Sequence, residues 1–221
     1  MALNLLMLGP PGAGKGTQAE RFAKERGIPK ISTGDILREA VHDKTEIGLR
    51  AKAIMDRGEL VSDEVMIGIV GRRLERPDAS GGFVLDGFPR TVAQAAALDA
   101  IMSRRDPLIV VDIVVPEEEL VRRLGTRSIC RLCGTGAPVG SGVGAACGKC
   151  GGRLVQRTDD NQAVVLERLK VYHRQSEPLV EYYRVRPTFR SIDGAQPPDR
   201  VAADLAAAIA AASNGAAGVQ G

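Results

Sequence analysis

The sequence predicts an α/β fold in which helices cover both faces of a five-stranded parallel sheet. Nearly continuous apolar runs alternate with stretches of helical patterning, and strands that are buried on both faces read as such runs. A glycine-rich loop follows the first run directly, and polar loops follow the next two. The expected strands are residues 3–9, 28–33, 82–87, 108–115 and 188–193.

Size and composition indicate one globular core with room for inserted modules. The chain has 221 residues, of which 44% are hydrophobic and 26% are charged, as in soluble globular proteins. The opening stretch LNLLMLG is short and leads straight into the glycine loop, which favours a buried strand over a signal peptide. No apolar run approaches the roughly 20 residues that span a bilayer. We therefore expect a cytoplasmic protein without membrane contact.

The charged and aromatic residues argue against a nucleic-acid partner. The net charge is only +3 and aromatic residues make up 3% of the chain, whereas nucleic-acid grooves are basic and carry stacking aromatics. Arginines outnumber lysines, and arginine is the better bidentate partner for phosphate. The alternative is that many of these arginines are plain solvated surface.

The first strand ends in the stretch GPPGAGKGTQ, residues 9–18, which nearly fits the phosphate-binding pattern G-x-x-x-x-G-K-[ST]. The glycines at 12, 14 and 16 give the backbone freedom that a curled loop needs, and Lys15 supplies a cation. The hydroxyl arrives one place late, at Thr17. The alternative is a glycine-rich turn with an exposed lysine. A strand before the loop and a helix after it favour a phosphate-binding loop (P-loop).

The helix after this loop is expected over Thr17–Arg26. At its start, the Thr17 hydroxyl can either cap the first turn or approach Mg²⁺ through water.

The second and third strands also end in polar loops, STGDILR and DGFPR. Because ligands of parallel sheets lie outside the carboxyl ends of the strands, all three loops should meet at one crevice. Asp86 ends the third strand and can hold Mg²⁺ through its water shell, or it can cap the turn before Gly87. Arg90 would then point into the same crevice. Asp35 and Arg38 repeat this arrangement after the second strand.

Two segments interrupt the alternation of strands and helices. Residues 34–62 have helical patterning without a strand, and residues 126–157 are rich in glycine and cysteine with almost no apolar periodicity. We interpret both as modules standing over the crevice. A long helix is expected over Asn161–Tyr183, and residues 214–221 are expected to be disordered.

Four cysteines form two C-x-x-C pairs separated by 13 residues: Cys130, Cys133, Cys147 and Cys150. This spacing is close to that of zinc sites with four thiolates. Such a set leaves no open position for water, so the site would be structural, stapling a segment that lacks an apolar core. The alternative is a redox-active pair, although two matched pairs favour zinc in a reducing cytosol.

Taken in order, five stretches closely resemble the adenylate kinases: GPPGAGKGTQ, STGDILR, DGFPRTVAQ, RTDDN and YHRQSEPLVEYY. The resemblance covers about residues 3 to 205, and G-K-G-T is characteristic of that family. The cysteines resemble the zinc-bearing lid of the long-lid type. The resemblance implies a P-loop NTPase-like core (1–31, 62–125 and 164–221), an AMP-binding insertion (32–61) and a lid (126–163).

The same resemblance implies Mg²⁺-dependent, reversible transfer of the terminal phosphoryl group of ATP to AMP, giving two ADP. Its biological role would be adenine nucleotide homeostasis and salvage, performed by a monomer with a structural Zn²⁺. The motif matches carry over the following residues. The catalytic set is Lys15, Asp86, Arg90, Arg127, Arg157 and Arg168. The ATP set is Gly12, Ala13, Gly14, Lys15, Gly16, Thr17, Arg123, Arg127 and Gln196. The AMP set is Thr33, Arg38, Glu59, Leu60, Val61, Gly87, Phe88, Pro89, Arg90, Gln94, Arg157 and Arg168.

Asp159 and Asp160 match the acidic pair beside the lid arginines, and the Gln94 amide suits the edge of adenine. The chain departs from the family pattern in the lid, where the stretch between the cysteine pairs is short. Gly136 and Ala137 stand where a hydroxyl and an aromatic residue usually meet the ATP base. Gln196 replaces a commonly basic residue.

Two other functions remain open. Another nucleoside monophosphate kinase, acting on UMP or CMP, is the nearer one, but the long lid and Gln94 argue against it. The second is a nucleic-acid-binding zinc module attached to an inactive P-loop domain, which the charge and aromatic content disfavour.

Overall fold

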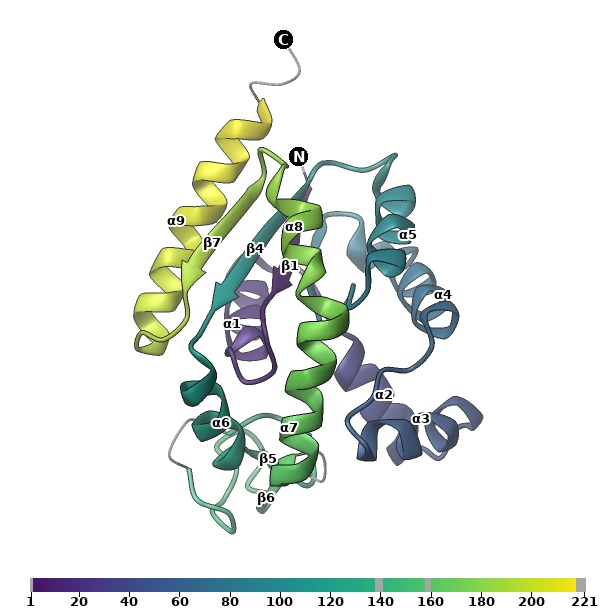
Figure 1. The fold of residues 1–221 in the computed structure, drawn as a ribbon, viewed down its shortest axis with the longest axis vertical. Helices are drawn as coiled ribbons and strands as arrows, with labels where there is room; N and C mark the ends of the chain where they lie inside the picture. Colours follow the sequence, from purple (N-terminus) through teal and green to yellow (C-terminus); the bar gives the residue numbers. More distant parts are fainter. Residues whose placement is uncertain (1, 138–140, 158–159, 218–221) are drawn as a thin grey trace.

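A computed structural model describes residues 2–137, 141–157 and 160–217, and it contains a five-stranded parallel sheet of order β2-β3-β1-β4-β7 (Figure 1). All five predicted strands are confirmed. Their bounds are Leu3–Leu8 (β1), Lys30–Ser32 (β2), Gly82–Asp86 (β3), Leu108–Val114 (β4) and Phe189–Asp193 (β7). Because β1 lies between β3 and β4, the loops after β1 and β3 are neighbours at the carboxyl edge.

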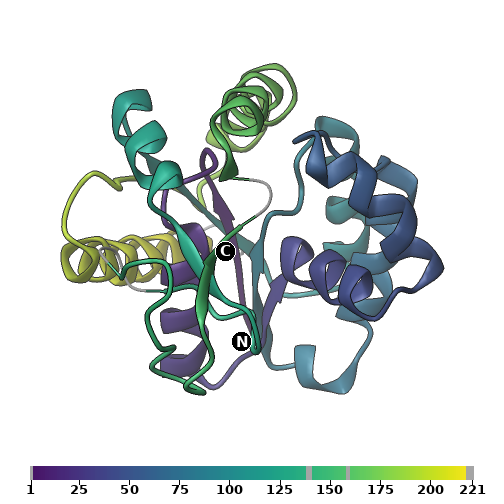
Figure 2. The same cartoon turned by 90° about the horizontal axis from the view of Figure 1, so that it is seen from below.

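Helices cover both faces of the sheet, as predicted. On one face, Leu5 and Met7 of β1 pack with α1 and α9; on the other, Leu6 and Leu8 pack with α4, α5 and α8. Seen from below, the yellow α9 and the blue-to-teal helices α2–α5 lie on opposite sides of the molecule (Figure 2). The core helices are Lys15–Arg26 (α1), Asp63–Leu74 (α4), Val92–Met102 (α5), Glu117–Gly125 (α6) and Pro198–Ala217 (α9).

Two helix ends differ from prediction. Helix α1 begins at Lys15, two residues before Thr17, and its N-cap is Gly14, which has no side chain to cap it. The Thr17 hydroxyl therefore does not cap the helix. Helix α9 continues to Ala217, so the prediction of disorder is wrong for residues 214–217, because the alanine-rich sequence prolongs the helix. Residues 218–221 lie outside the described part of the chain.

The helical insertion, residues 34–62, holds most of α2 (Thr33–His42) and all of α3 (Glu46–Asp56) and contains no strand, as predicted. The two helices pack tightly at Gly48. A β-carbon there would lie 2.0 Å from the carbonyl oxygen of Ala40, so only glycine permits this approach.

The predicted helix over Asn161–Tyr183 is interrupted. It consists of α7 (Gln162–Val171), a π turn (Tyr172–Ser176) and α8 (Pro178–Arg184). The three pieces form one green rod along the sheet (Figure 1). Pro178 lacks a backbone N–H, and the wider turn before it accommodates this interruption.

The cysteine segment, residues 126–157, forms a second, antiparallel sheet of β5 (Ser128–Cys130) and β6 (Leu154–Gln156). It lies at the end of the molecule toward which β4 and β7 point, as does the helical insertion (Figure 1). The expectation of no apolar core needs correction. Cys130, Cys147 and Leu154 form a small buried cluster with Ala137 packed against it, and two of its three buried members are cysteines.

Candidate active site

The loop after β1 is pressed against the neighbouring strand. Gly9, Gly12 and Gly14 have φ values of 133°, 89° and 91°, which side chains other than glycine rarely adopt. A β-carbon at Gly9 would lie 2.6 Å from the carbonyl oxygen of Ile113 on β4. The sequence thus places glycine where the loop must curl, and the first N–H groups of α1 face the crevice end of the sheet.

Lys15 lies at the electrostatic centre of the site. Its ammonium group donates to the carbonyl oxygens of Gly9, at 2.6 Å, and Pro10, at 2.8 Å. Burial lowers the pKa of Lys15 to about 8, Asp86 opposes this shift, and three cations add to it: Arg90, Arg168 and Arg127. Four charged residues from three distant stretches of sequence therefore act on one amine.

Asp86 ends β3 directly beside the P-loop. It pairs in register with Met7 of β1 and Ser32 of β2. A β-carbon at Gly16 would lie 3.3 Å from Asp86 Oδ2, so this carboxylate borders the first turn of α1. A carboxylate oxygen beside a P-loop can hold the water shell of Mg²⁺, and the site's donor chemistry fits that ion.

The loops after β2 and β3 meet at one carbonyl group. The oxygen of Gly87 accepts from Thr33 Oγ1 at 2.7 Å and from Arg90 Nε at 2.8 Å. The structure thus brings together two residues of the predicted AMP set from different strands. Phe88 is 1% exposed and belongs to the core.

Arg38 projects from α2 and pairs with Asp35. Burial favours the protonated form of Asp35, but Arg38 and Lys30 prevail and lower its pKa to about 2. Glu59 pairs with Arg57, with 2.8 Å between Glu59 Oε2 and Arg57 Nη2.

Gln94 is only 1% exposed, and both polar groups of its amide are engaged within the protein. Its Oε1 accepts from the Arg90 backbone N–H at 2.8 Å, and its Nε2 donates to Asp63 Oδ1 at 2.7 Å. Contact of this amide with a base remains a prediction.

Arg127 and Arg168 converge on Asp160, whose side chain is 0% exposed. Arg127 Nε donates to Asp160 Oδ2 at 2.6 Å, and Arg168 Nη1 donates to Oδ1 at 2.9 Å. The carbonyl oxygen of Arg157 accepts from the Asp160 N–H at 3.2 Å. Asp159, the other half of the predicted acidic pair, lies outside the described residues.

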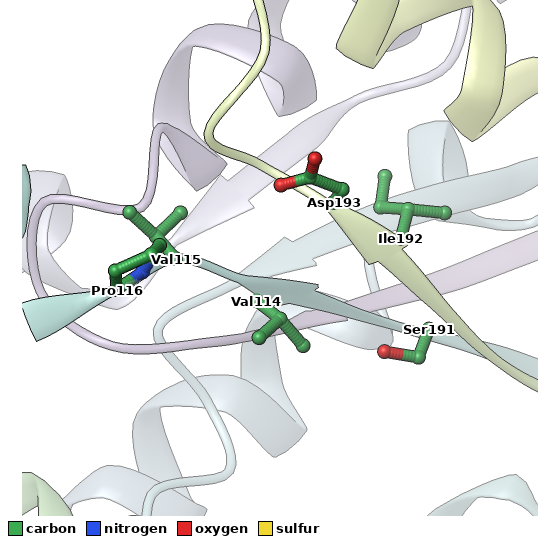
Figure 3. A pocket seen from close by; sticks show the side chains of 6 residues that line it. All are labelled: Val114, Val115, Pro116, Ser191, Ile192 and Asp193. Carbon is green, nitrogen blue, oxygen red and sulfur yellow. The ribbon is translucent and has the colours of Figure 1, made fainter.

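Two residues of the predicted ATP set have partners inside the protein. Arg123 Nε donates to Glu119 Oε1 at 2.7 Å, so the two residues form a salt bridge within α6. Gln196 Nε2 donates to Asp204 Oδ2 at 2.7 Å. A hollow of about 480 Å³ lies at the carboxyl ends of the paired strands β4 and β7 (Figure 3). Its lining residues are Val114, Val115, Pro116, Ser191, Ile192 and Asp193.

The four cysteines form one cluster in which every pair of sulfur atoms lies within 4.8 Å. The Sγ atoms of Cys130 and Cys150 are 3.4 Å apart, and those of Cys133 and Cys147 are 3.7 Å apart. A tetrahedron with metal–sulfur bonds of about 2.3 Å has sulfur–sulfur edges of about 3.8 Å. All four cysteines are free thiols, so the cluster has the geometry of a metal site and contains no disulfide.

The two cysteine pairs are folded alike. The N–H groups of Gly134 and Gly151 donate to the carbonyl oxygens of Cys130, at 3.0 Å, and Cys147, at 2.8 Å. Both glycines have positive φ values, 68° and 73°. The repeated pattern C-x-x-C-G carries this signal, but the sequence analysis did not use the glycines.

Comparison with known proteins agrees with this geometry. A family model described as adenylate kinase matches residues 7–188. The chain belongs to the adenylate kinase family. An adenylate kinase of Archaeoglobus fulgidus is 53% identical over 199 residues, which cover 87% of this chain and 91% of that protein. An adenylate kinase of Rhizobium etli is 46% identical over 216 residues, covering 94% and 99% of the two chains. For one of Syntrophobacter fumaroxidans the identity is 51% over 197 residues, with coverages of 87% and 92%.

In this member of the adenylate kinase family, sequence reasoning missed the residues that hold others in place. Asp63 and Ser176 contact Gln94 and Arg90, respectively. Asp63 lies outside the quoted motifs, and Ser176 lies in YHRQSEPLVEYY but was given no role. Glu119 could have been found, because it lies four residues before Arg123 on one helix.

In the part of the chain that the structure describes, none of the helices combines the length and the apolar character that a membrane span needs.

Proposed function

We propose that this chain catalyses the reversible reaction of Mg·ATP with AMP to give two ADP. The observation that carries the proposal is that Asp86 and three arginines act electrostatically on Lys15, where the loops after the adjacent strands β1 and β3 meet. Family membership supports the choice of adenine nucleotides. In the reaction, the bond between the γ-phosphorus and the β–γ bridging oxygen breaks. A bond from an AMP phosphate oxygen to that phosphorus forms.

On the donor side, the P-loop residues Gly12 to Thr17 hold the phosphates of ATP. Their backbone N–H groups at the start of α1 attract anions, and Lys15 places its ammonium at the transferring group. Magnesium, when bound with ATP, neutralises phosphate charge. Asp86 would hold the ion's water shell from the end of β3.

On the acceptor side, Thr33, Arg38 and Arg90 bind AMP, with the stretches Glu59–Val61 and Gly87–Arg90 forming the walls. The shared contact of Thr33 and Arg90 with the Gly87 carbonyl supports one common pocket. The acceptor phosphate is already anionic, so a general base is not needed. Catalysis then consists of positioning and charge neutralisation.

The lid contributes Arg127 and Arg157, and α7 contributes Arg168. Closure brings these cations to the phosphates and excludes water. Arg123 would close on the phosphates of ATP, and Gln196 would lie beside the donor base. Taking these roles requires Arg123 to leave Glu119, and Gln196 to bind through its backbone or to leave Asp204.

The four cysteines bind a structural zinc ion. Their separations fit a tetrahedral thiolate site, and the matching turns at the two pairs support it. Four thiolates leave no position for substrate, so the ion would hold the lid folded and take no part in transfer. Reduced cysteines are expected in a cytoplasmic compartment. We also propose that the protein acts as a monomer, which sedimentation analysis would test.

A coupled assay of ADP formation from ATP tests the proposal, with AMP, UMP, CMP and GMP as acceptors. AMP should be used at least tenfold better than UMP or CMP in kcat/KM. If UMP were used as well as AMP, the chain would be another nucleoside monophosphate kinase and the proposal would be wrong. A salt-dependent gel shift with single-stranded RNA, combined with no ADP formation, would favour a nucleic-acid-binding protein.

A further inference from the structure

A hydrogen-bonded chain runs from Asp63, at the first residue of α4, to the backbone of Arg90. Asp63 Oδ1 accepts from the Gln94 amide at 2.7 Å, and Gln94 Oε1 accepts from the Arg90 N–H at 2.8 Å. Asp63 Oδ2 accepts from the Thr91 hydroxyl at 2.9 Å. Asp63 and Gln94 are 31 residues apart in sequence.

Arg90 is held from the other side as well. Its carbonyl oxygen accepts from Ser176 Oγ at 2.8 Å, and Ser176 closes the π turn between α7 and α8. Both backbone polar groups of this arginine are thus bound by side chains from other elements. The guanidinium in turn reaches the Gly87 carbonyl through Nε.

The donor and acceptor roles in these hydrogen bonds allow only one orientation of the Gln94 amide. The Arg90 N–H can only donate, and an ionised Asp63 can only accept. A rotated amide would place nitrogen against the N–H and oxygen against the carboxylate. The carboxylate therefore fixes the amide, and the amide fixes the backbone from which the Arg90 side chain departs.

We propose that Asp63 is a positioning residue for the phosphoryl acceptor, acting through Gln94 on Arg90. Gln94 serves in this arrangement as a clamp on Arg90, since its amide oxygen and nitrogen both have partners inside a side chain that is 1% exposed. The inference rests on the proposed function, in which Arg90 binds the acceptor phosphate. It adds Asp63, which no comparison of motifs selected.

The first test is a double-mutant cycle with Asp63→Asn and Arg90→Lys. Asparagine keeps the size of Asp63 but supplies one acceptor atom where the carboxylate supplies two, so the Gln94 amide or the Thr91 hydroxyl loses its acceptor. Acceptor kcat/KM should fall about tenfold in Asp63→Asn, with the KM for ATP unchanged. Combined with Arg90→Lys, the loss should be clearly smaller than the product of the two single losses. Multiplicative losses would overturn the proposal.

Gln94→Leu removes the link between Asp63 and Arg90. The Gln94 amide has a second N–H and a second lone pair, so contact with a base is compatible with the clamp. The clamp predicts that Asp63→Asn causes little further loss of acceptor kcat/KM in the Gln94→Leu background. A full tenfold further loss in that background would overturn the proposal.

Asp99→Asn is the matched control. Asp99 lies on α5 and accepts from Tyr182 and Arg186 of the α8 region. Its replacement should lower the melting temperature and leave acceptor kcat/KM unchanged. A comparable loss of acceptor use in this variant would mean that Asp63→Asn acts through stability alone.

Hydrogen exchange of the Arg90 amide gives a readout independent of catalysis. The parent should exchange slowly, and Asp63→Asn and Gln94→Leu should both accelerate exchange at least tenfold. Unchanged protection would overturn the clamp. If the parent forms no ADP from ATP and AMP while the exchange results hold, the proposed function fails and the clamp stands.

Discussion

Arg127 and Asp160 form a paired contact across 33 residues, with Arg127 Nε 2.6 Å from Asp160 Oδ2. The same carboxylate accepts from Arg168 on α7 and its side chain is 0% exposed. One buried aspartate therefore aligns Arg127, at the start of the cysteine segment, with Arg168 on α7. Removing it leaves two guanidinium groups facing each other without their shared anion.

We expect Asp160→Asn to lower kcat by roughly ten- to a hundredfold. Loss of one partner of a buried ion pair typically costs about 3–5 kcal/mol, and part of that loss should appear as poorer alignment of Arg127 and Arg168. Steady-state kinetics and limited proteolysis of residues 126–157 would measure both effects. The exposed-pair variant Asp78→Asn should leave kcat unchanged, and a wild-type rate in Asp160→Asn would refute the alignment role.

Lys15 should take up a proton when Mg·ATP binds near pH 8. Its pKa is lowered to about 8, so about half of the ligand-free molecules carry a neutral amine there, and phosphate charge will favour the ammonium form. Calorimetry in two buffers of different ionisation enthalpy should give an uptake of about half a proton. Lys15→Arg should abolish the uptake, because arginine stays charged.

The lowered pKa also has a stability consequence. Between pH 8 and 10.5 the unfolded chain binds the Lys15 proton and the folded chain does not, so this group's destabilising effect is full below pH 8 and is relieved as the pH rises. The melting temperature of Lys15→Met should exceed that of the parent most at pH 7. Its kcat should be lower by orders of magnitude, because the ammonium stabilises charge that moves in transfer.

Removal of metal from the cysteine cluster should destabilise the lid and spare the sheet. Among the described residues of the cysteine segment, Leu154 and two cysteines are the buried members of its apolar cluster, whereas the central sheet has its own large core. Elemental analysis should find about one zinc per chain, and chelation should lower the melting temperature and the activity on heating. Metal-free protein as purified under reducing conditions would contradict the site. So would a Cys147→Ala, Cys150→Ala variant that melts with the parent.

Gly48→Ala should weaken use of AMP without weakening use of ATP. A β-carbon would lie 2.0 Å from the Ala40 carbonyl oxygen, so α2 and α3 must separate, and Thr33 and Arg38 lie on α2. The KM for AMP should rise several-fold, and the KM for ATP should stay constant. Gly68→Ala on α4, where a β-carbon meets nothing within 4 Å, is the matched control. Equal effects of the two variants would disprove the packing argument.

The strands and the loops at their ends could be predicted because their signals are local. Apolar runs such as residues 108–115 mark buried strands, and parallel strands carry their loops to one edge. The π turn at Tyr172–Ser176 could not be predicted, because a single widened turn leaves the apolar pattern of a helix nearly intact.

The partners of polar side chains inside the protein could not be predicted. Contact of the Gln94 amide with adenine stays a prediction, but nothing in the sequence indicated its hydrogen bonds to Asp63 and Arg90. Such a pairing depends on how α4 and α5 pack, which no spacing of residues encodes. Where both partners lie on one helix, as with Glu119 and Arg123, the pair could have been predicted, because residues four apart on a helix are neighbours on its surface.

The pairing of β1 with β3 sets Met7 opposite Asp86, and it fixes the distance between the starts of the two loops that follow these strands. The donor loop grows from one strand and the acceptor loop from its immediate neighbour, so their roots stand one hydrogen-bonded spacing apart, about 4.8 Å. Backbone hydrogen bonds between the strands determine this distance, so it does not depend on the side chains. Substitutions in the two loops can change which phosphates are held, but the span between the loops' roots is set by the sheet.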